Sequence, residues 1–491
     1  MKRSSFRFPP IVASLLVLAV FAVFAVTSGD TVLAQQNPPP SGFTSLFNGS
    51  DLTGWYGWST RDPNDLWKMN EEEQLKYKKA SVEGGILNNA GAPDNEHINA
   101  HWRVENGELV NDGKGLYLTS MKDYGDFELS LEYKALPLGD SGVYLRGTPQ
   151  VQIWDPSEAD PQGLGRALGS GGLWNNHAGA LGKDPLKKMD KPLGEWNRLK
   201  MIMIGERVTI VFNGEVVVDN AVLENFFANQ KSGYLAYRKD DAEKKGAEAK
   251  KLPNGYMSDP VYAKGPIQLQ THGSEIRWRN IFIREIPAEE ANATLAVRDA
   301  AGFVEMNNGN DLSNWQGAVD SYEVKDQAIV CKQGQGGDLL LKEEYQNFIL
   351  RCEFKLPAAG NNGIALRTPV GGQSSSDGLE IQVIDSDGYN AKHPEENLKP
   401  YQYHGSLYHC VGAKHGYLRP TGEWNFQEIE VQGQSIKVTL NGTKILDVDI
   451  DQFDRSQIEN APKGLDQPKG FIGFAGHSDP VAFRSFKVKR L

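Results

Sequence analysis

The sequence contains little cysteine: three residues in 491, at positions 331, 352 and 410, all in the second half. An odd count excludes complete pairing within one chain, so a disulfide framework is not expected to hold the fold together. A bond from Cys331 to Cys352 or Cys410 would be allowed in an exported protein, but no spacing indicates one. Cys352 alternates with Leu350 and Phe354, which predicts a core position.

Long apolar runs are also scarce, and residues 11–26 form the one conspicuous exception. Basic residues precede this run and the small-residue stretch "VLA" (32–34) follows it, so residues 1–34 are predicted to be a secretory signal peptide. An uncleaved membrane anchor is the alternative, although 16 apolar residues fall short of the ~20 that a spanning helix needs. No cysteine follows the run to carry a lipid. We therefore expect a secreted or periplasmic protein with no stable membrane insertion after cleavage.

The sequence has fewer basic residues (52 Lys and Arg) than acidic residues (63 Asp and Glu). The formal net charge is −11, and it becomes −13 without the leader, which holds three basic residues and one acidic residue. An acidic surface repels phosphate backbones, and no basic stripe interleaved with aromatic residues is present. Nucleic acid is therefore excluded as an expected partner.

What the sequence does contain is an internal repeat. "NGSDLTGW" (48–55) returns as "NGNDLSNW" (308–315), and further pairs follow in the same order: "DFELSLEYK" (126–134) with "NFILRCEFK" (347–355), "VQIWD" (151–155) with "IQVID" (381–385), and "GEWN" at 194–197 and 422–425. This pattern predicts two tandem copies of one domain. The predicted boundaries are 43–286 and 303–491, with a polar, Ala-rich linker at 287–302.

Each copy is predicted to be all-β. Residues 126–134 alternate apolar and polar side chains, which is typical of a strand with one buried face. Asn213-Gly214 and Asn441-Gly442 each separate two alternating arms, as a tight hairpin requires. Many short strands favour a concanavalin A-like β-sandwich, or jelly roll, in each copy. The first copy also carries insertions at 58–100 and 228–263, which we expect to form solvated helices; a lid over a neighbouring cleft is the alternative.

Strand alternation also predicts a polar face in each copy. If Val143, Leu145, Val151 and Ile153 face the core, the side chains between and beside them face the other way. These outward residues are Tyr144, Arg146, Gln150, Gln152 and Trp154 in the first copy, and Arg367, Glu380 and Gln382 in the second. Amide, guanidinium and carboxylate groups among aromatic rings suit the hydroxyls and C–H faces of a sugar. A face simply exposed to water is the alternative.

Carboxylates are too few for ordinary glycoside hydrolysis. "EIQVID" (380–385) invites comparison with the E-x-D-x-x-E strand of laminarinase-like glycosidases, but Gln382 replaces the middle carboxylate and Glu380 lies five positions from Asp385. The first copy has only Asp155 after Gln150 and Gln152. A two-carboxylate glycosidase therefore fits poorly.

Histidines are the remaining candidates for proton transfer. The segment 401–417 contains His404, Tyr408 and His409, and the equivalent segment 171–180 contains Trp174 and His177. Their spacing matches no standard zinc signature, so we predict rim loops whose histidines carry protons or bind hydroxyls. His272 and His477 each precede an arginine by seven residues, and either a structural role or a site role would explain them.

The ordered set of motifs, from N-G-x-D-L-x-x-W through "SGVYLRG", "VQIWD" and "GEWN" to "HG…RWRNI", resembles the bacterial 3-keto-disaccharide hydrolase domain family. The resemblance covers nearly all of the chain after the leader, twice over. It implies a concanavalin-like jelly roll that acts on glycosides already oxidised at C3 of the sugar.

Such a substrate explains the shortage of carboxylates. A ketone at C3 acidifies the C2 hydrogen, so the bond at C1 can break by β-elimination followed by hydration. We predict Glu380 as the base, Arg367 as the stabiliser of the enolate, and His404 or His409 as the acid. Predicted substrate-binding residues are Gln382, Tyr408, His477, Tyr144, Arg146, Gln152, Trp154, Asp155, Trp174, His177 and His272.

Several alternatives stay open from the sequence. No cofactor is predicted, although a divalent ion held by Asp385 and the rim histidines would be another way to stabilise an enolate. The first copy lacks a counterpart of Glu380 and is expected to bind rather than cleave, or to act on another ligand. A non-catalytic tandem carbohydrate-binding protein is the competing function, and a scaffold without a sugar site is the third.

Overall fold

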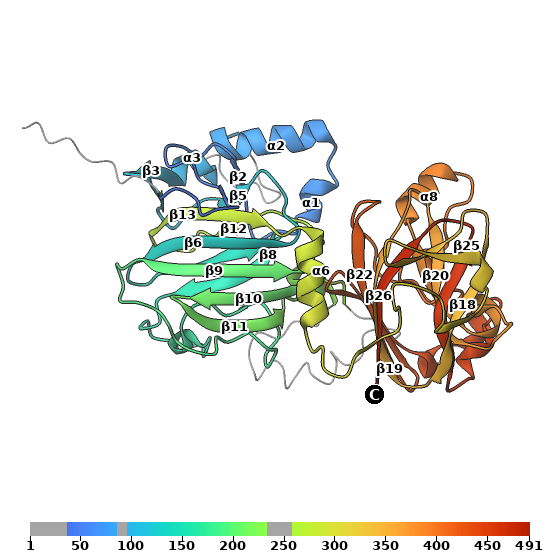
Figure 1. Cartoon of the computed structure of the whole chain (residues 1–491). Helices are drawn as coiled ribbons and strands as arrows, with labels where there is room; N and C mark the ends of the chain where they lie inside the picture. The colour runs from blue at the N-terminus through green and yellow to red at the C-terminus, as the bar shows by residue number, and fades with distance from the viewer. Residues whose placement is uncertain (1–36, 86–95, 233–257) are drawn as a thin grey trace, which may run out of the picture.

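In the computed structural model, residues 37–85, 96–232 and 258–491 are described. They form two β-sandwiches that follow one another along the chain (Figure 1). The predicted leader (1–34) and the helix-tolerant run at 240–252 lie outside the described residues. Among the described residues, no helix has the length and apolar character needed to cross a bilayer.

The first sandwich packs an eight-stranded antiparallel sheet against a five-stranded one. The larger sheet contains β1 (Thr44–Ser45), β3 (Trp102–Glu105), β4 (Glu108–Asn111), β6 (Phe127–Ala135), β9 (Asn197–Ile204), β10 (Arg207–Phe212), β11 (Glu215–Val222) and β13 (Ile276–Glu285). The smaller sheet runs in the order β2 (Trp55–Trp58), β5 (Tyr117–Ser120), β12 (Gln268–Leu269), β7 (Asp140–Leu145), β8 (Thr148–Trp154).

The second sandwich repeats this topology strand for strand. Its larger sheet contains β14 (Val304–Glu305), β16 (Tyr322–Lys325), β17 (Ala328–Cys331), β19 (Phe348–Lys355), β22 (Trp424–Gln432), β23 (Ser435–Leu440), β24 (Thr443–Asp449) and β26 (Ala482–Arg490). Its smaller sheet runs in the order β15 (Trp315–Gly317), β18 (Gly336–Tyr345), β25 (Gly470–His477), β20 (Asn361–Thr368), β21 (Leu379–Ile384). The predicted tandem repeat and all-β fold are confirmed.

Helices are few and short. They are α1 (Asn64–Trp67), α2 (Glu71–Glu83), α3 (Ile98–His101), α4 (Phe226–Ser232), α6 (Ala288–Val297), α7 (Ser374–Asp377) and α8 (Ser386–Lys392), with 3₁₀ turns at Arg166–Leu168, Val319–Ser321, Pro400–Gln402, Ile450–Gln452, Arg455–Gln457 and Lys463–Leu465. Helix α2 is not simply solvated, because Tyr77 packs edge-on to Trp58 at 4.9 Å and Ser81 Oγ accepts a hydrogen bond from Gly57 N. The first insertion thus covers the β2 edge of the smaller sheet.

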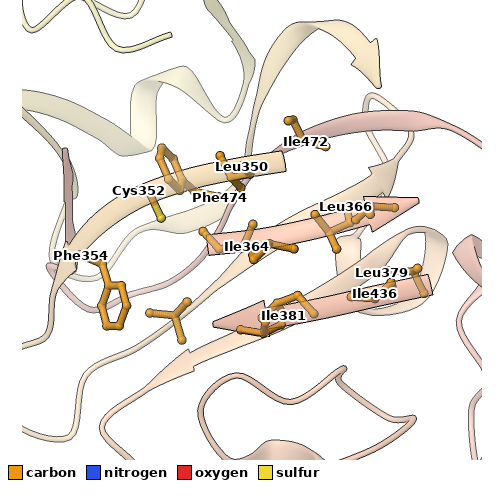
Figure 2. Close-up of a cluster of buried hydrophobic side chains, with 14 of the residues drawn as sticks. Leu350, Cys352, Phe354, Ile364, Leu366, Leu379, Ile381, Ile436, Ile472 and Phe474 are labelled. Atoms are coloured by element: carbon orange, nitrogen blue, oxygen red, sulfur yellow. The ribbon is translucent and has the colours of Figure 1, made fainter. Parts of the chain in front are cut away.

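The core of each copy lies between its two sheets. In the second copy, Leu350, Cys352 and Phe354 of β19 face Ile364 and its neighbours across the sandwich (Figure 2). All three cysteines are free thiols, and the core position predicted for Cys352 is confirmed. The two predicted Asn-Gly hairpins are also confirmed, with positive φ at both residues of each turn.

The linker between the copies forms a helix that packs against both of them. Residues Ala288–Val297 form helix α6, whose Ala291 and Leu295 pack with Ile204 of the first copy and Phe426 of the second. Two hairpin turns also meet here, where Glu206 N donates to Gly442 O at 3.3 Å. This junction encloses a cavity of about 620 Å³. Half of its charged lining residues pair with one another: Arg351 with Glu428 at 2.6 Å, Lys437 with Glu430 at 2.9 Å and Lys444 with Asp447 at 2.5 Å.

Candidate active site

The candidate site lies on the outward side of the smaller sheet of the second copy, named here the polar face. Alternation creates it: Ile364 and Leu366 of β20, with Leu379 and Ile381 of β21, point into the core (Figure 2). The residues between them must point the other way. The register therefore sets Glu380 beside Ala365 and Gln382 beside Gly363 on the polar face.

Glu380 is held in an unusual environment for a carboxylate. Its side chain is only 2% exposed and lies over Gly363, where a Cβ would come within 2.2 Å of Glu380 Oε1. That oxygen accepts no hydrogen bond from the described residues and lies 3.6 Å from His477 Nε2. A buried carboxylate oxygen without a hydrogen-bond donor is costly, which makes it available to a substrate proton.

His477 ends β25 and is half-exposed beside Glu380. Its pKa is raised, first by the interaction with Glu380 and further by the charges of Asp338 and Asp479. Asp338 is held by Ser374, whose backbone N donates to it at 2.7 Å and whose hydroxyl donates at 3.2 Å. Burial raises the pKa of Asp338 to about 6, and the charge of Glu380 adds to this effect.

Asp338 was not predicted from the sequence. Leu339, Leu340 and Leu341 are all buried, so the "DLLL" run does not alternate and gave no clear signal for the face that Asp338 takes. The paired residue of Asp338 is Ala475, two positions from His477. Asp338 therefore belongs to the polar face.

A loop after β21 brings Tyr408 and His409 to the same place. Its backbone pairs with the edge of β21, where Tyr408 N donates to Glu380 O at 2.9 Å. The rings of Tyr408 and His409 lie edge-to-face at 4.3 Å. His409 Nδ1 is buried without a partner among the described residues, and burial lowers the pKa of the ring while the charge of Glu380 opposes this.

The remaining predicted residue on this face is Gln382. It is buried, and its Nε2 donates to Asn361 Oδ1 at 2.7 Å. Five residues predicted from the sequence therefore meet on or beside the polar face of the second copy: Glu380, Gln382, Tyr408, His409 and His477.

The placement predicted for both arginines is wrong. Arg367 has a φ of +49° and Arg146 a φ of +53°, and these left-handed conformations break the alternation on which the prediction rested. Arg367 donates to Gly433 O at 2.6 Å, to Gln434 Oε1 at 3.0 Å and to Gly464 O at 3.2 Å. Its guanidinium joins the end of the smaller sheet to a turn of the larger one, away from Glu380.

Arg146 makes the corresponding clamp in the first copy. It donates to Asp126 Oδ1 and Tyr262 O at 3.0 Å and to Gly125 O at 2.9 Å. Burial lowers the pKa of both arginines. Neither guanidinium is placed to contact a sugar on the polar face.

The site role predicted for His404 is also wrong. It is buried in the second copy, where its ring stacks on Phe354 at 5.0 Å and its Nε2 contacts Gln427 Oε1 at 3.0 Å. Burial lowers its pKa to about 3. A neutral, enclosed imidazole is a packing residue and cannot deliver a proton to a substrate.

The aspartates that follow the edge strands serve loop structure. Asp155 accepts hydrogen bonds from Leu138 N at 3.1 Å and Ser157 N at 2.8 Å, which lower its pKa despite burial. Asp385 likewise accepts from Ala359 N at 2.8 Å. The proposed contact of Asp155 with substrate is therefore not supported, and across the described ranges no three His, Cys, Asp or Glu side chains are grouped to hold a metal.

In the first copy, the polar face is buried rather than exposed to water. Tyr144 contacts Thr60 Oγ1 at 3.0 Å, and Gln152 Nε2 donates to Asp140 Oδ1 at 2.8 Å. Trp154 and Trp174 lie edge-to-face at 5.4 Å. These residues and His272, which is 3.3 Å from Asp140, are brought together as predicted. His272 has a raised pKa because of this carboxylate.

His177 lies elsewhere. Its backbone N donates to Glu224 Oε2 at 3.0 Å, its Nδ1 contacts the other oxygen of the same carboxylate, and this interaction raises its pKa. Glu224 lines the cavity at the junction of the two copies. His177 is therefore paired with a residue of the junction cavity and not with a residue of the polar face.

Comparison with known proteins fits this architecture. A family model described as a 3-keto-alpha-glucoside-1,2-lyase-like domain matches residues 42–284 and 302–489. The chain belongs to this family. A 3-keto-disaccharide hydrolase of Bacteroides thetaiotaomicron is 25% identical over 251 residues, which cover 43% of this chain and 86% of that relative. The predicted family and its duplication are confirmed, and the family is a carbohydrate-active one.

Solved structures similar to the chain match about one sandwich each. One, from Parabacteroides distasonis and described provisionally as a glycosyl hydrolase, has a TM-score of 0.36 and 25% identity, covering 39% of this chain and 96% of that one. Another is the carbohydrate binding module CBM66 from Bacillus subtilis, with a TM-score of 0.23 and 10% identity, covering 38% of this chain and 95% of that one.

Proposed function

We propose that the second copy cleaves 3-keto-glycosides by elimination and hydration. The observation that carries this proposal is the meeting of Glu380, His477 and His409 on one face, with a buried carboxylate oxygen that the described residues leave without a hydrogen bond. The description of the family as a 1,2-lyase and of the Bacteroides relative as a 3-keto-disaccharide hydrolase supports it.

The first step removes the C2 proton. Glu380 accepts this proton, and the electrons of the C2–H bond form a C2=C3 double bond while the C3=O electrons move onto the oxygen, which gives an enolate. The enolate then collapses: the C3=O bond forms again, the C2=C3 electrons become a C1=C2 double bond, and the C1–O bond breaks. Protonated His477 donates a hydrogen bond to the C3 oxygen, which carries the negative charge of the enolate. His477 takes the role first expected of Arg367, because its raised pKa favours the charged form next to Glu380.

His409 protonates the leaving oxygen. Burial lowers its pKa, so its imidazolium gives up a proton more readily than an exposed one. Water then adds across C1=C2: the hydroxyl joins C1, one water proton returns to His409, and Glu380 returns its proton to C2. The net reaction is hydrolysis, and one carboxylate suffices because no glycosyl cation forms.

Export belongs to the same proposal. Cleavage after Ala34 would place the chain outside the cytoplasm. The mass of the protein recovered from the periplasm tests this, since an uncleaved chain would start at Met1.

Turnover of 3-ketotrehalose by residues 35–491 tests the chemistry. We expect release of glucose and 3-ketoglucose, together with exchange of the C2 hydrogen in D₂O. Glu380→Gln should lower turnover and exchange by roughly 10³-fold. Glu430→Gln is the matched control, because Glu430 pairs with Lys437 on the larger sheet at 2.9 Å. Equal cleavage of unoxidised trehalose, or cleavage without C2 exchange, would contradict the mechanism.

A further inference from the structure

The polar faces of the two copies correspond residue by residue. Matching strand pairs define the correspondence: Gln152 opposite Gly142 in the first copy, and Gln382 opposite Gly363 in the second. Two positions earlier on the same strand and face, Gln150 therefore stands where Glu380 stands.

The flanking loops correspond in the same way. Trp174 N donates to Gln150 O at 3.2 Å, as Tyr408 N donates to Glu380 O at 2.9 Å. The next residue of each loop is then Asn175 in the first copy and His409 in the second. The first copy thus replaces the proposed base and the proposed acid with amides, which hydrogen-bond but do not exchange protons at neutral pH.

The centre of this face is closed in the first copy. Tyr144 occupies the position that Ala365 has in the second copy, and its hydroxyl contacts Thr60 of the insertion at 3.0 Å. At the β8 edge the neighbour is the loop with Trp174, whose Leu173 forms a β-bridge with Val151. Any ligand would therefore lie along β8 and this loop.

Buried acceptors gather on this face. Gln150 Oε1, Gln270 Oε1 and Asn175 Oδ1 are all in side chains more than nine-tenths buried, and none has a hydrogen-bond partner among the described residues. Leaving such an oxygen without a donor costs about 1–3 kcal/mol. Gln270 lies beside the Tyr144 hydroxyl in the closed centre, so the acceptors that indicate missing donors at the β8 edge are Gln150 on β8 and Asn175 in the neighbouring loop. Hydroxyl groups supply donors without charge.

Aromatic surface lies beside these acceptors. Trp154 and Trp174 meet edge-to-face at 5.4 Å, with the Arg166 guanidinium over the first at 5.4 Å and the Lys183 ammonium over the second at 4.2 Å. Trp154 is 6% exposed and Trp174 is half-buried, so Trp174 is the indole that can stack on the C–H face of a sugar. We propose that the first copy holds a second saccharide site, at the β8 edge, which binds a neutral glycoside through its hydroxyl groups and does not cleave it.

The acceptors also predict a preference between substrates. An amide oxygen accepts a hydrogen bond from a sugar hydroxyl but repels the oxygen of a ketone. The first copy should therefore bind an unoxidised glycoside more tightly than its 3-keto derivative. This preference would retain the precursor of the substrate next to the cleaving copy.

Calorimetry on the full Glu380→Gln chain, with trehalose as the probe, tests the proposal. We expect one binding event that Gln150→Leu and Trp174→Ala each weaken at least tenfold, while the exposed-site control Gln457→Leu leaves it unchanged. 3-Ketotrehalose should compete at the first copy less well than trehalose. Gln150→Leu also removes the hydrogen bond from Gln150 Nε2 to Gln152 Oε1, so its melting temperature is measured alongside binding to show that the variant is folded at the assay temperature.

Two results would overturn the proposal: no trehalose binding to the Glu380→Gln chain, or binding that both first-copy variants leave unchanged. Failure here is distinguishable from failure of the proposed function. Binding is read in the Glu380→Gln chain, whereas cleavage of 3-ketotrehalose is read in the wild-type chain, and either can fail alone.

Discussion

Replacement of Arg367 with Met separates its structural role from the catalytic role that the sequence predicted. The guanidinium donates three hydrogen bonds, to Gly433 O, Gln434 Oε1 and Gly464 O, from a side chain 2% exposed. Methionine fills a similar volume but donates nothing. Hydrogen bonds from a charged group contribute about 1.5–3 kcal/mol each, part of which is offset because burying the guanidinium is itself costly.

The net destabilisation should be about 3–5 kcal/mol, because three hydrogen bonds are lost and three neutral acceptors are left without a donor, while the burial cost of the guanidinium is relieved. For a unit of 150–250 residues, each kcal/mol lowers the melting temperature by ~2–4 °C, so a decrease of about 10 °C is expected. Differential scanning calorimetry should show this shift in one of the two transitions. Arg146→Met, which breaks the clamp of the first copy, should shift the other.

Turnover distinguishes the two roles. Well below both melting temperatures, Arg367→Met should keep kcat for 3-ketotrehalose within about threefold, because its bonds go to a turn rather than to Glu380. A loss of roughly a hundredfold in kcat with an unchanged melting temperature would refute this reasoning. That result would support the enolate-stabilising role that the sequence predicted for Arg367.

Two further predictions concern ionisation. Asp338→Asn removes a negative charge that helps to keep His477 protonated, so the titration of the His477 ring, followed by NMR, should move to lower pH. A diagonal neighbour lies ~7–8 Å away, where the Coulomb energy of about 1–2 kcal/mol, screened by solvent, predicts a shift of roughly 0.5–1 pH unit; an unmoved titration would exclude this coupling. At the junction, burial raises the pKa of Glu206 from 4.5 to about 7. Its stabilising contribution is therefore complete at pH values below 4.5 and lost as pH rises through 7, by roughly 2–3 kcal/mol. Glu206→Gln should abolish that part of the pH dependence of unfolding, and parallel curves for both proteins would contradict it.

Much of the fold follows from period-two alternation and the repeat. Phe127, Leu129 and Leu131 predicted a buried strand face and are buried. The Asn-Gly hairpins were equally predictable, because few other sequences accept two successive positive φ angles. Alternation also predicted the outward placement of Glu380 and Gln382, since β21 is regular along its whole length.

Prediction failed where the strand is not regular. The register of β20 against β25 shifts between Ala365 and Thr368, and Arg367 lies within that shift with a left-handed backbone. The segment "ALRTP" (365–369) contains no residue that would predict such a bulge, because arginine does not favour positive φ. His404 failed for another reason: loops have no period, so the sequence could not distinguish a histidine stacked on the core from one at the rim.

Duplication of a β-sandwich allows the polar faces of the two copies to differ while the architecture stays the same. Core positions are constrained by packing, since a change of one methylene in a close-packed interior is felt by its neighbours. The outward positions are buried as well, but in the first copy an insertion contributes to their cover through Thr60, so Glu380 and Gln150 can diverge while Gln382 and Gln152 keep their places. A carboxylate-to-amide difference on an unchanged frame alters proton transfer far more than shape. The polar faces would then divide one task, with retention of a glycoside on the first and its cleavage after oxidation on the second.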